Sequence, residues 1–166
     1  MSEGEGKQGV PWRIIGIGSP VAGDDLGWLA IDWLRNAGFD RDAELLTLDR
    51  PGPALIDYLQ PDSRVILIDA MDAGLPAGSV RELALDGIIV RASAPSSHDL
   101  GLAEALALAR ALGGLPRHLY VVGIQMGADG ADGAGQEWRR EACSALTTRV
   151  RGMMQVPVAV GTEAIS

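Results

Sequence analysis

The sequence predicts an α/β fold, a three-layer sandwich with a mostly parallel, twisted central sheet and helices on both faces. Short apolar runs alternate along the chain with segments of helical periodicity, a pattern typical of parallel sheets joined by crossover helices. The apolar runs are also nearly continuous, as expected of strands buried on both faces. No repeat or linker divides the chain, so one α/β domain is predicted.

The first predicted unit is a strand, a tight turn and a helix. Residues 12–18 are largely apolar and end in a Gly-Ile-Gly sequence, which is typical of a buried strand that opens into a tight turn. Apolar residues then recur at helical spacing over residues 26–37, and Gly38 is a suitable stop. We interpret Asp24 as the N-cap of this helix and Asp25 as favourable to its dipole.

The same order of elements repeats through the rest of the chain. Residues 99–112 are rich in alanine and leucine, so this helix is expected to be buried on most of its circumference. The run over residues 79–85 alternates enough for an edge strand. The remaining predictions are strands at 43–48, 65–68 and 119–124, a short helix ending near residue 59, a loop at 126–136 and a last helix at 138–151.

Length and composition bound the class of protein. The 166 residues suit one domain, and we expect a flexible tail at 1–11, a single α/β domain at 12–152 and a second tail at 153–166. The net charge of -8 argues against nucleic acid as a partner, because such surfaces must neutralise phosphates. The single cysteine, Cys143, excludes a disulfide framework and a multi-cysteine metal site.

The sequence also argues against a membrane as a partner. No apolar run approaches the roughly 20 residues of a membrane helix. Residues 1–11 are polar and rich in glycine, without the apolar stretch of a secretion signal. We therefore expect a cytoplasmic protein, and a monomer.

Polar residues gather where predicted strands end, which is where ligands bind in such folds. Asp25 follows the first strand, Asp69 follows the third, and His98 precedes the Ala/Leu-rich helix. Two carboxylates and an imidazole suit divalent ions such as zinc, nickel or manganese. Each also has a structural interpretation: Asp25 as a dipole partner, Asp69 as a nearly buried acid that needs a hydrogen-bond partner, and His98 as a helix-start residue.

Other chemistries fit the sequence poorly. The third glycine after Gly16 and Gly18 comes too late for a dinucleotide-binding fingerprint. The only lysine, Lys7, lies in the predicted tail, so a phosphate-binding loop is excluded. No GxSxG sequence marks a serine nucleophile. Cys143 lies within the last predicted helix and is interpreted as a core residue.

Four segments of the chain form an ordered set: GIGSP with GDDLG at 16–27, IDAMDAG at 68–74, SHDLGL at 97–102 and, more weakly, VGIQ at 122–125. This set resembles the nickel–iron hydrogenase maturation proteases, endopeptidases that trim the carboxyl terminus of the hydrogenase large subunit. Each match is short, but their order and spacing over residues 13–150 are specific. Two departures stand out: Ser19 replaces a usual Asn, and the sequence Asp-Arg-Pro-Gly at 49–52 replaces a Gly-rich loop.

The resemblance implies a site, a cofactor and a partner. Asp25, Asp69 and His98 would contact nickel, with Asp25 and Asp69 also catalytic in an aspartic-type endopeptidase. Nickel would arrive on the substrate, the precursor of a hydrogenase large subunit, and the isolated protein would be empty or hold another divalent cation. Water would be activated either by the metal as a Lewis acid or by a carboxylate as general base.

Two alternative functions share these features. One is a non-catalytic metal-binding or nucleotide-binding α/β module, which would use the same glycine turn and alternating elements. The other is a relative of the same peptidase fold that acts on another protein.

Overall fold

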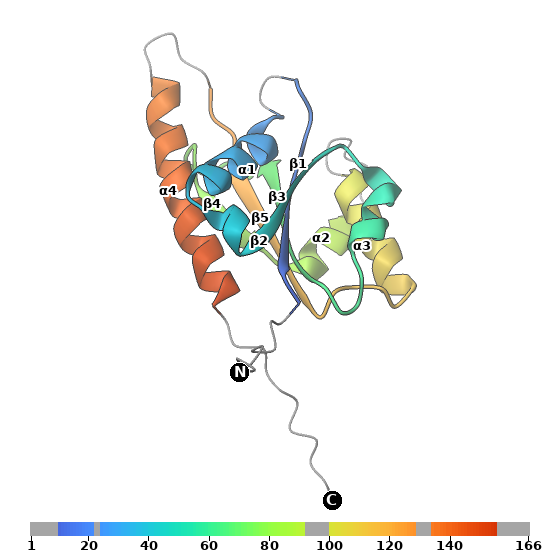
Figure 1. Ribbon diagram of the computed structural model, residues 1–166. Coiled ribbons are helices and arrows are strands. Elements are labelled where there is room, and N and C mark those ends of the chain that lie inside the picture. Colours follow the sequence, from blue (N-terminus) through green and yellow to red (C-terminus); the bar gives the residue numbers. More distant parts are fainter. Residues whose placement is uncertain (1–9, 22–23, 92–99, 129–133, 156–166) are drawn as a thin grey trace, which may run out of the picture.

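A computed structural model of the chain describes residues 10–21, 24–91, 100–128 and 134–155. In Figure 1 the sheet is seen nearly edge-on, with α1 and α4 on one side and α2 and α3 on the other. The molecule therefore has three layers, and the predicted α/β sandwich is confirmed.

The sheet has five strands in the order β2-β1-β3-β5-β4. Neighbouring strands are parallel except at one edge, where β4 is antiparallel to β5. The carboxyl ends of β1, β2, β3 and β5 therefore meet at one edge of the sheet, which we call the carboxyl edge. The strands are β1 (Trp12–Gly18), β2 (Ala43–Asp49), β3 (Arg64–Met71), β4 (Val80–Leu83) and β5 (His118–Gln125).

Three of the helices differ from the prediction. Helix α2 and the short η1 were not predicted: the expected edge strand ended at residue 85, and residues 86–91 were assigned to no element. Helix α4 begins four residues earlier than expected and runs past the predicted domain end at residue 152. Residues 1–9 and 156–166 lie outside the described residues, so the two predicted tails stay predictions. The helices are α1 (Leu26–Asn36), η1 (Phe39–Arg41), η2 (Gly52–Tyr58), α2 (Leu85–Arg91), α3 (Leu100–Ala111) and α4 (Ala134–Met154).

Strand β3 shows why the apolar runs of the sequence are continuous. Ile66 and Ile68 pack into the core beneath α1 and α4, whereas Val65 and Leu67 pack into the core beneath η2 and α3. All four side chains are fully buried. A strand covered on both faces needs apolar residues at every position rather than at alternate ones.

The expected burial of α3 on most of its circumference is wrong. The buried residues of α3 lie on one face, at Ala103, Ala105, Leu106 and Ala109, while Leu108 is 43% exposed. The helix belongs to an outer layer of the sandwich (Figure 1), so only one face of it can contact other elements. Its Ala/Leu composition cannot reveal this, because both residues are also tolerated at the surface.

None of the helices in the described part of the chain is long and apolar enough to cross a membrane.

Helix α1 packs on β1 with main chain against main chain. A Cβ atom on Gly16 would lie 2.0 Å from the carbonyl oxygen of Gly27, and a Cβ atom on Gly27 would lie 2.0 Å from that of Ile17. Only glycine fits at both positions. The contact fixes the start of α1 against the last residues of β1, at the carboxyl edge.

We expect Gly27→Ala to lower the free energy of unfolding by about 3 kcal/mol or more, the upper end of the usual cost of overpacking. The added Cβ would meet main-chain atoms, which cannot move aside as a flexible side chain can. Urea unfolding measures the change. Gly152→Ala is the matched control: the added Cβ in α4 would meet nothing within 4 Å, so the variant should be as stable as the wild type or up to about 1 kcal/mol more stable. Equal stability of Gly27→Ala and wild type would contradict the close contact.

Candidate functional site

Ser19 braces the turn between β1 and α1. Its side chain is fully buried, and its hydroxyl donates a 2.6 Å hydrogen bond to the carboxylate of Asp24. The same hydroxyl accepts a hydrogen bond from the N–H of Val21 at 3.3 Å. The main-chain N–H of Ser19 donates to the carbonyl of Asp24 at 2.9 Å. The residue that departs from the family pattern therefore still holds this turn closed.

The interpretation of Asp24 as the N-cap of α1 is wrong. The N-cap is Asp25, and its side chain makes no capping hydrogen bond. The carboxylate of Asp24 accepts a hydrogen bond from Ser19 instead. The spacing of residues in the sequence does not show that Ser19 is buried next to Asp24. Asp25 is half-buried, and its carboxylate has no hydrogen bond or ion pair with any residue in the described ranges. This carboxylate is therefore available to a ligand.

Asp69 lies within β3, two residues before the strand ends. It is half-buried, and its Oδ1 accepts the N–H of Ala70 at 2.8 Å. Because side chains alternate along a strand, Asp69 faces the same side as Leu67, toward the layer of α3. Pairing of Gly16 with Ile68 places Asp69 beside the end of β1. The structure thus brings Asp25 and Asp69 to the carboxyl edges of adjacent strands.

The predicted third member, His98, lies outside the described residues. Helix α3 begins two residues after it, at Leu100. A Cβ on Gly101 would lie 3.7 Å from the Cα of Gly52, in the segment that follows β2, so α3 starts at the carboxyl edge. Among the described residues alone, no three histidine, cysteine or acidic side chains form a possible metal site. The assignment of Asp25, Asp69 and His98 as ligands stays a prediction.

Gln125 organises the loop that follows Asp69, and sequence reasoning missed this role. Its side chain is only 4% exposed. Its Oε1 accepts the N–H groups of Ala73 at 2.8 Å and Leu75 at 3.3 Å, and its Nε2 donates to Asp72 and to the carbonyl of Met126, both at 3.2 Å. The available signal was an amide residue at the end of an apolar strand.

Cys143 lies on α4 and is half-buried. Burial raises the pKa of its thiol, so the side chain is protonated and a poor nucleophile at neutral pH. This argues against a thiol mechanism.

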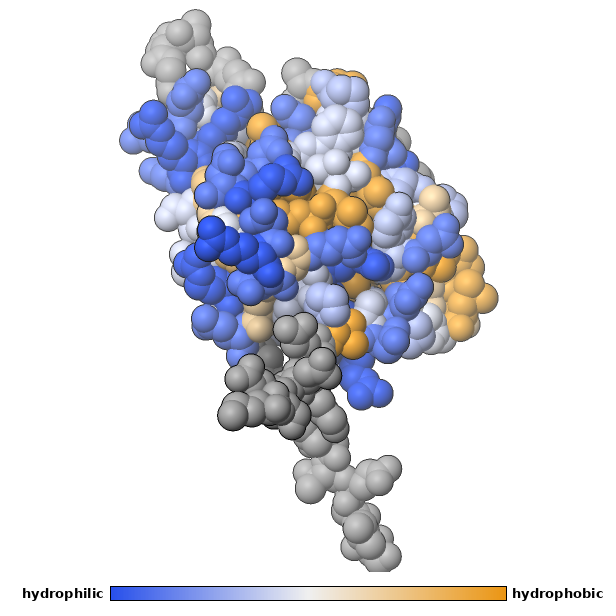
Figure 2. All heavy atoms as spheres, in the orientation of Figure 1, coloured by the Kyte–Doolittle hydropathy of each residue, from blue (hydrophilic) through white to orange (hydrophobic). Residues whose placement is uncertain are grey.

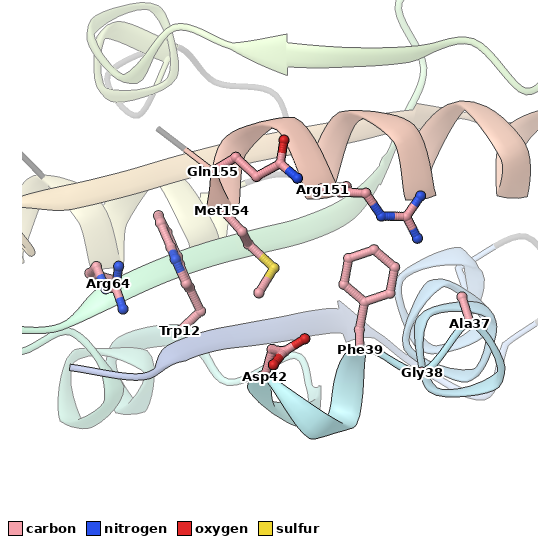
Figure 3. Close-up of a pocket in the computed structure, with 9 residues that line it drawn as sticks. All are labelled: Trp12, Ala37, Gly38, Phe39, Asp42, Arg64, Arg151, Met154 and Gln155. Carbon is pink, nitrogen blue, oxygen red and sulfur yellow. The ribbon is translucent and has the colours of Figure 1, made fainter. Parts of the chain in front are cut away.

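A cavity of about 370 Å³ lies at the amino ends of the strands, opposite the carboxyl edge. Figure 3 shows it between the first residues of β1 and β3 and the last turn of α4. Its charged groups are mainly cationic: the guanidinium of Arg64 lies 5.0 Å from the ring centre of Trp12, and that of Arg151 lies 5.3 Å from Phe39. Asp42 is the single acid in this lining. The paired acids of the carboxyl edge have no counterpart here.

The fold and the carboxyl edge define an α/β protein with two acidic side chains at the ends of neighbouring parallel strands. The sequence model of the HycI hydrogenase maturation protease family matches residues 39–137, more than half of the chain. The chain belongs to the hydrogenase maturation protease family. The matched range contains Asp69 and position 98 but not Asp25.

Individual relatives agree with this membership. The hydrogenase expression/formation protein HupD of Thiocapsa roseopersicina is 32% identical over 116 residues, which cover 68% of this chain and 52% of HupD. The corresponding HupD of Bradyrhizobium diazoefficiens is 29% identical, over 68% of this chain and 60% of the relative. The chain therefore spans little more than half the length of these curated relatives.

Solved structures share the fold. The hydrogenase maturating endopeptidase HybD from E. coli superimposes with a TM-score of 0.63 at 16% identity, over 86% of this chain and 94% of that structure. The maturation protease HycI from Thermococcus kodakarensis KOD1 gives a TM-score of 0.60 at 21% identity, over 89% and 94%. At these identities the comparison supports the architecture alone.

We expect Gln125→Ala to cost about 1–3 kcal/mol of unfolding free energy, since it removes a buried side chain that bonds to the main-chain N–H groups of Ala73 and Leu75. The amide protons of Ala73 and Leu75 should also exchange faster with solvent. Gln60→Ala, at an exposed position, serves as the control and should stay within about 0.5 kcal/mol of wild type. Unchanged exchange at both amides would show that Gln125 does not hold the loop.

Proposed function

We propose that this chain is an endopeptidase that removes a carboxyl-terminal peptide from the nickel-loaded precursor of a hydrogenase large subunit, in the cytoplasm. Membership of the maturation protease family supports the reaction class. The main support for the site is that Asp25 and Asp69 lie toward the carboxyl ends of neighbouring strands. Asp25 is the N-cap residue of α1, but its carboxylate makes no capping hydrogen bond. An acid that serves neither a cap nor an ion pair is free to act on a substrate.

In this proposal, nickel belongs to the substrate. Asp25, Asp69 and His98 would contact it, and the open coordination positions of a three-residue set would allow the substrate to keep its own ligands. Two carboxylates and one imidazole suit a divalent cation, because oxygen and nitrogen donors match a borderline metal. Another divalent cation would occupy the isolated protein only weakly.

Peptide hydrolysis also needs an activated water. We assign this role to the carboxylates, as in an aspartic-type peptidase, because Asp25 and Asp69 lie toward the carboxyl ends of neighbouring strands and Cys143 is a protonated thiol. A general base takes the proton of the attacking water and contributes about 10²–10⁴ in rate. The buried turn and the Gln125-held loop keep the main chain on either side of the two acids in place.

Asp25→Asn and Asp69→Asn should each lower the processing rate at least about a hundredfold, since the amide keeps the shape of the carboxylate but cannot accept a proton. His98→Ala should abolish processing and leave the melting temperature nearly unchanged. Mass spectrometry of a nickel-loaded precursor under reducing, anaerobic conditions measures the truncation. A variant that lowers kcat alone has lost the base, whereas one that raises KM has lost a contact to the substrate's nickel.

Wild-type processing by His98→Ala would remove that residue from the site. If the wild-type protein leaves the precursor intact but cleaves another protein, the chain is a peptidase of the same fold with a different substrate. Micromolar nucleotide binding without any cleavage would instead support the non-catalytic module.

Iodoacetamide at pH 7 should leave processing unchanged. The raised pKa of the Cys143 thiol keeps it protonated there, and labelling should increase as the pH rises toward that pKa, because the thiolate is the reactive form. Intact mass reports labelling, and Cys143→Ser provides the unlabelled control. Inactivation of wild type, together with protection in Cys143→Ser, would show that the thiol is near the reacting centre.

A further inference from the structure

Strand β2 is an edge strand with unused main-chain hydrogen-bonding groups. The N–H of Arg50 donates to the carbonyl of Gly18 at 3.0 Å, and Ile17 pairs with Leu48. Since main-chain groups alternate in direction along a strand, the even-numbered residues of β2 point toward β1. The N–H and C=O groups of Leu45 and Thr47 therefore point away from the sheet, and no residue of the described ranges bonds to them.

Three leucines of this edge are only partly covered, and its exposed side chains are the polar Glu44, Thr47 and Asp49. Leu45, Leu46 and Leu48 are only partly buried, and Figure 2 shows apolar surface in the middle of the face where β2 runs. The strand has seven residues and contains no proline. The charge of Glu44 is offset by Arg13 at 2.8 Å. An unpaired edge of this length with three partly exposed leucines favours pairing with another chain.

This edge leads to the candidate site. The last residue of β2, Asp49, pairs with Gly18 at the carboxyl edge, where the turn that carries Asp25 begins. Arg50 then adopts a φ of 36°, a left-handed conformation that is costly for a residue with a side chain. The chain bends away at this point. A second strand laid along β2 would therefore extend past Asp49 toward the two acids.

We propose that the β2 edge binds an extended, apolar segment of the substrate by strand addition and delivers the adjoining peptide bond to Asp25 and Asp69. The inference rests on the proposed function and names how that substrate is held. Main-chain pairing supplies affinity with little dependence on sequence, and the three leucines select apolar side chains. Pairing with a single strand is marginal by itself, which suits a substrate that must leave rather than a permanent subunit.

Thr47→Pro tests the pairing. It removes an N–H that points away from β1 and places the proline ring in the path of an added strand, so the ladder to β1 is retained. We expect KM for the hydrogenase large-subunit precursor of the same organism to rise about tenfold or more, with kcat nearly unchanged. That factor corresponds to one or two lost hydrogen bonds and a steric clash.

The matched control is a proline in the opposite edge strand. The carbonyl of Ser79 points toward β5, because it accepts the N–H of Gln125. Main-chain groups alternate in direction along a strand, so those of Arg81 also point toward β5 and the N–H of Glu82, in β4, points away from the sheet. Glu82→Pro should therefore leave KM and kcat at wild-type values. Urea unfolding of both variants confirms that each is folded. Equal KM for Thr47→Pro and wild type would overturn the proposal.

Amide exchange supplies a second readout that stability alone does not change. In the free protein the amides of Leu45 and Thr47 should exchange quickly and those of Leu46 and Leu48 slowly. Precursor bound to the inactive Asp69→Asn variant should slow exchange at Leu45 and Thr47. If precursor binds without protecting these amides, the edge proposal fails and the proposed function stands.

Two further outcomes would also overturn strand addition by substrate. A wild-type dimer that Thr47→Pro converts to monomer, detected by sedimentation, would show that a second copy covers the edge. If the wild-type protein neither binds nor processes the precursor, the proposed function fails. A segment of that precursor can then no longer be the chain that pairs with β2.

Discussion

The contact on which the candidate site depends is the direct approach of α1 to β1. Gly16 and Gly27 bring a helix and a strand together with no side chain between them, and a Cβ at either position would lie 2.0 Å from a carbonyl oxygen. This close packing fixes where α1 begins. Directly after β1, buried Ser19 is tied to Asp24 by its hydroxyl and by its main-chain N–H, which closes the turn before the helix. The position of Asp25 follows from that turn and from the glycine contact.

The second constraint is the double burial of β3. Ile66 and Leu67 lie in different cores, on opposite faces of the sheet, so the strand is rigidly held and cannot rotate or slip without exposing apolar surface. Asp69 is carried at the end of this strand, half-buried, with one oxygen bonded to the next main-chain N–H. A carboxylate held in this way loses little further entropy when it contacts a substrate. Gln125, on the adjacent strand, gives the following loop the same fixity.

The β2 edge of the sheet, unlike the buried strand β3, is open on one side. Strand β2 has neighbours on one side only, its leucines are partly exposed, and its outward main-chain groups are unbonded within the described part of the chain. The two acids thus stand on a rigid centre, whereas the surface beside them is open to another chain. The proposed endopeptidase activity would need both properties, because reacting groups must be preorganised while a substrate must enter and leave.

The sequence by itself determined the layers of the fold, because short, β-branched apolar runs such as the one at 65–68 alternate with helical segments and are typical of strands buried on both faces. It also placed Asp69 at the end of a core strand. Only the tertiary structure decided that Asp25, and not Asp24, is the N-cap residue of α1, while the carboxylate of Asp24 accepts from the buried hydroxyl of Ser19. The tertiary structure likewise decided that Gln125 holds the loop and that α3 is exposed on one side. Both features depend on contacts between residues that are distant in the sequence, and the local pattern of residues does not specify such contacts.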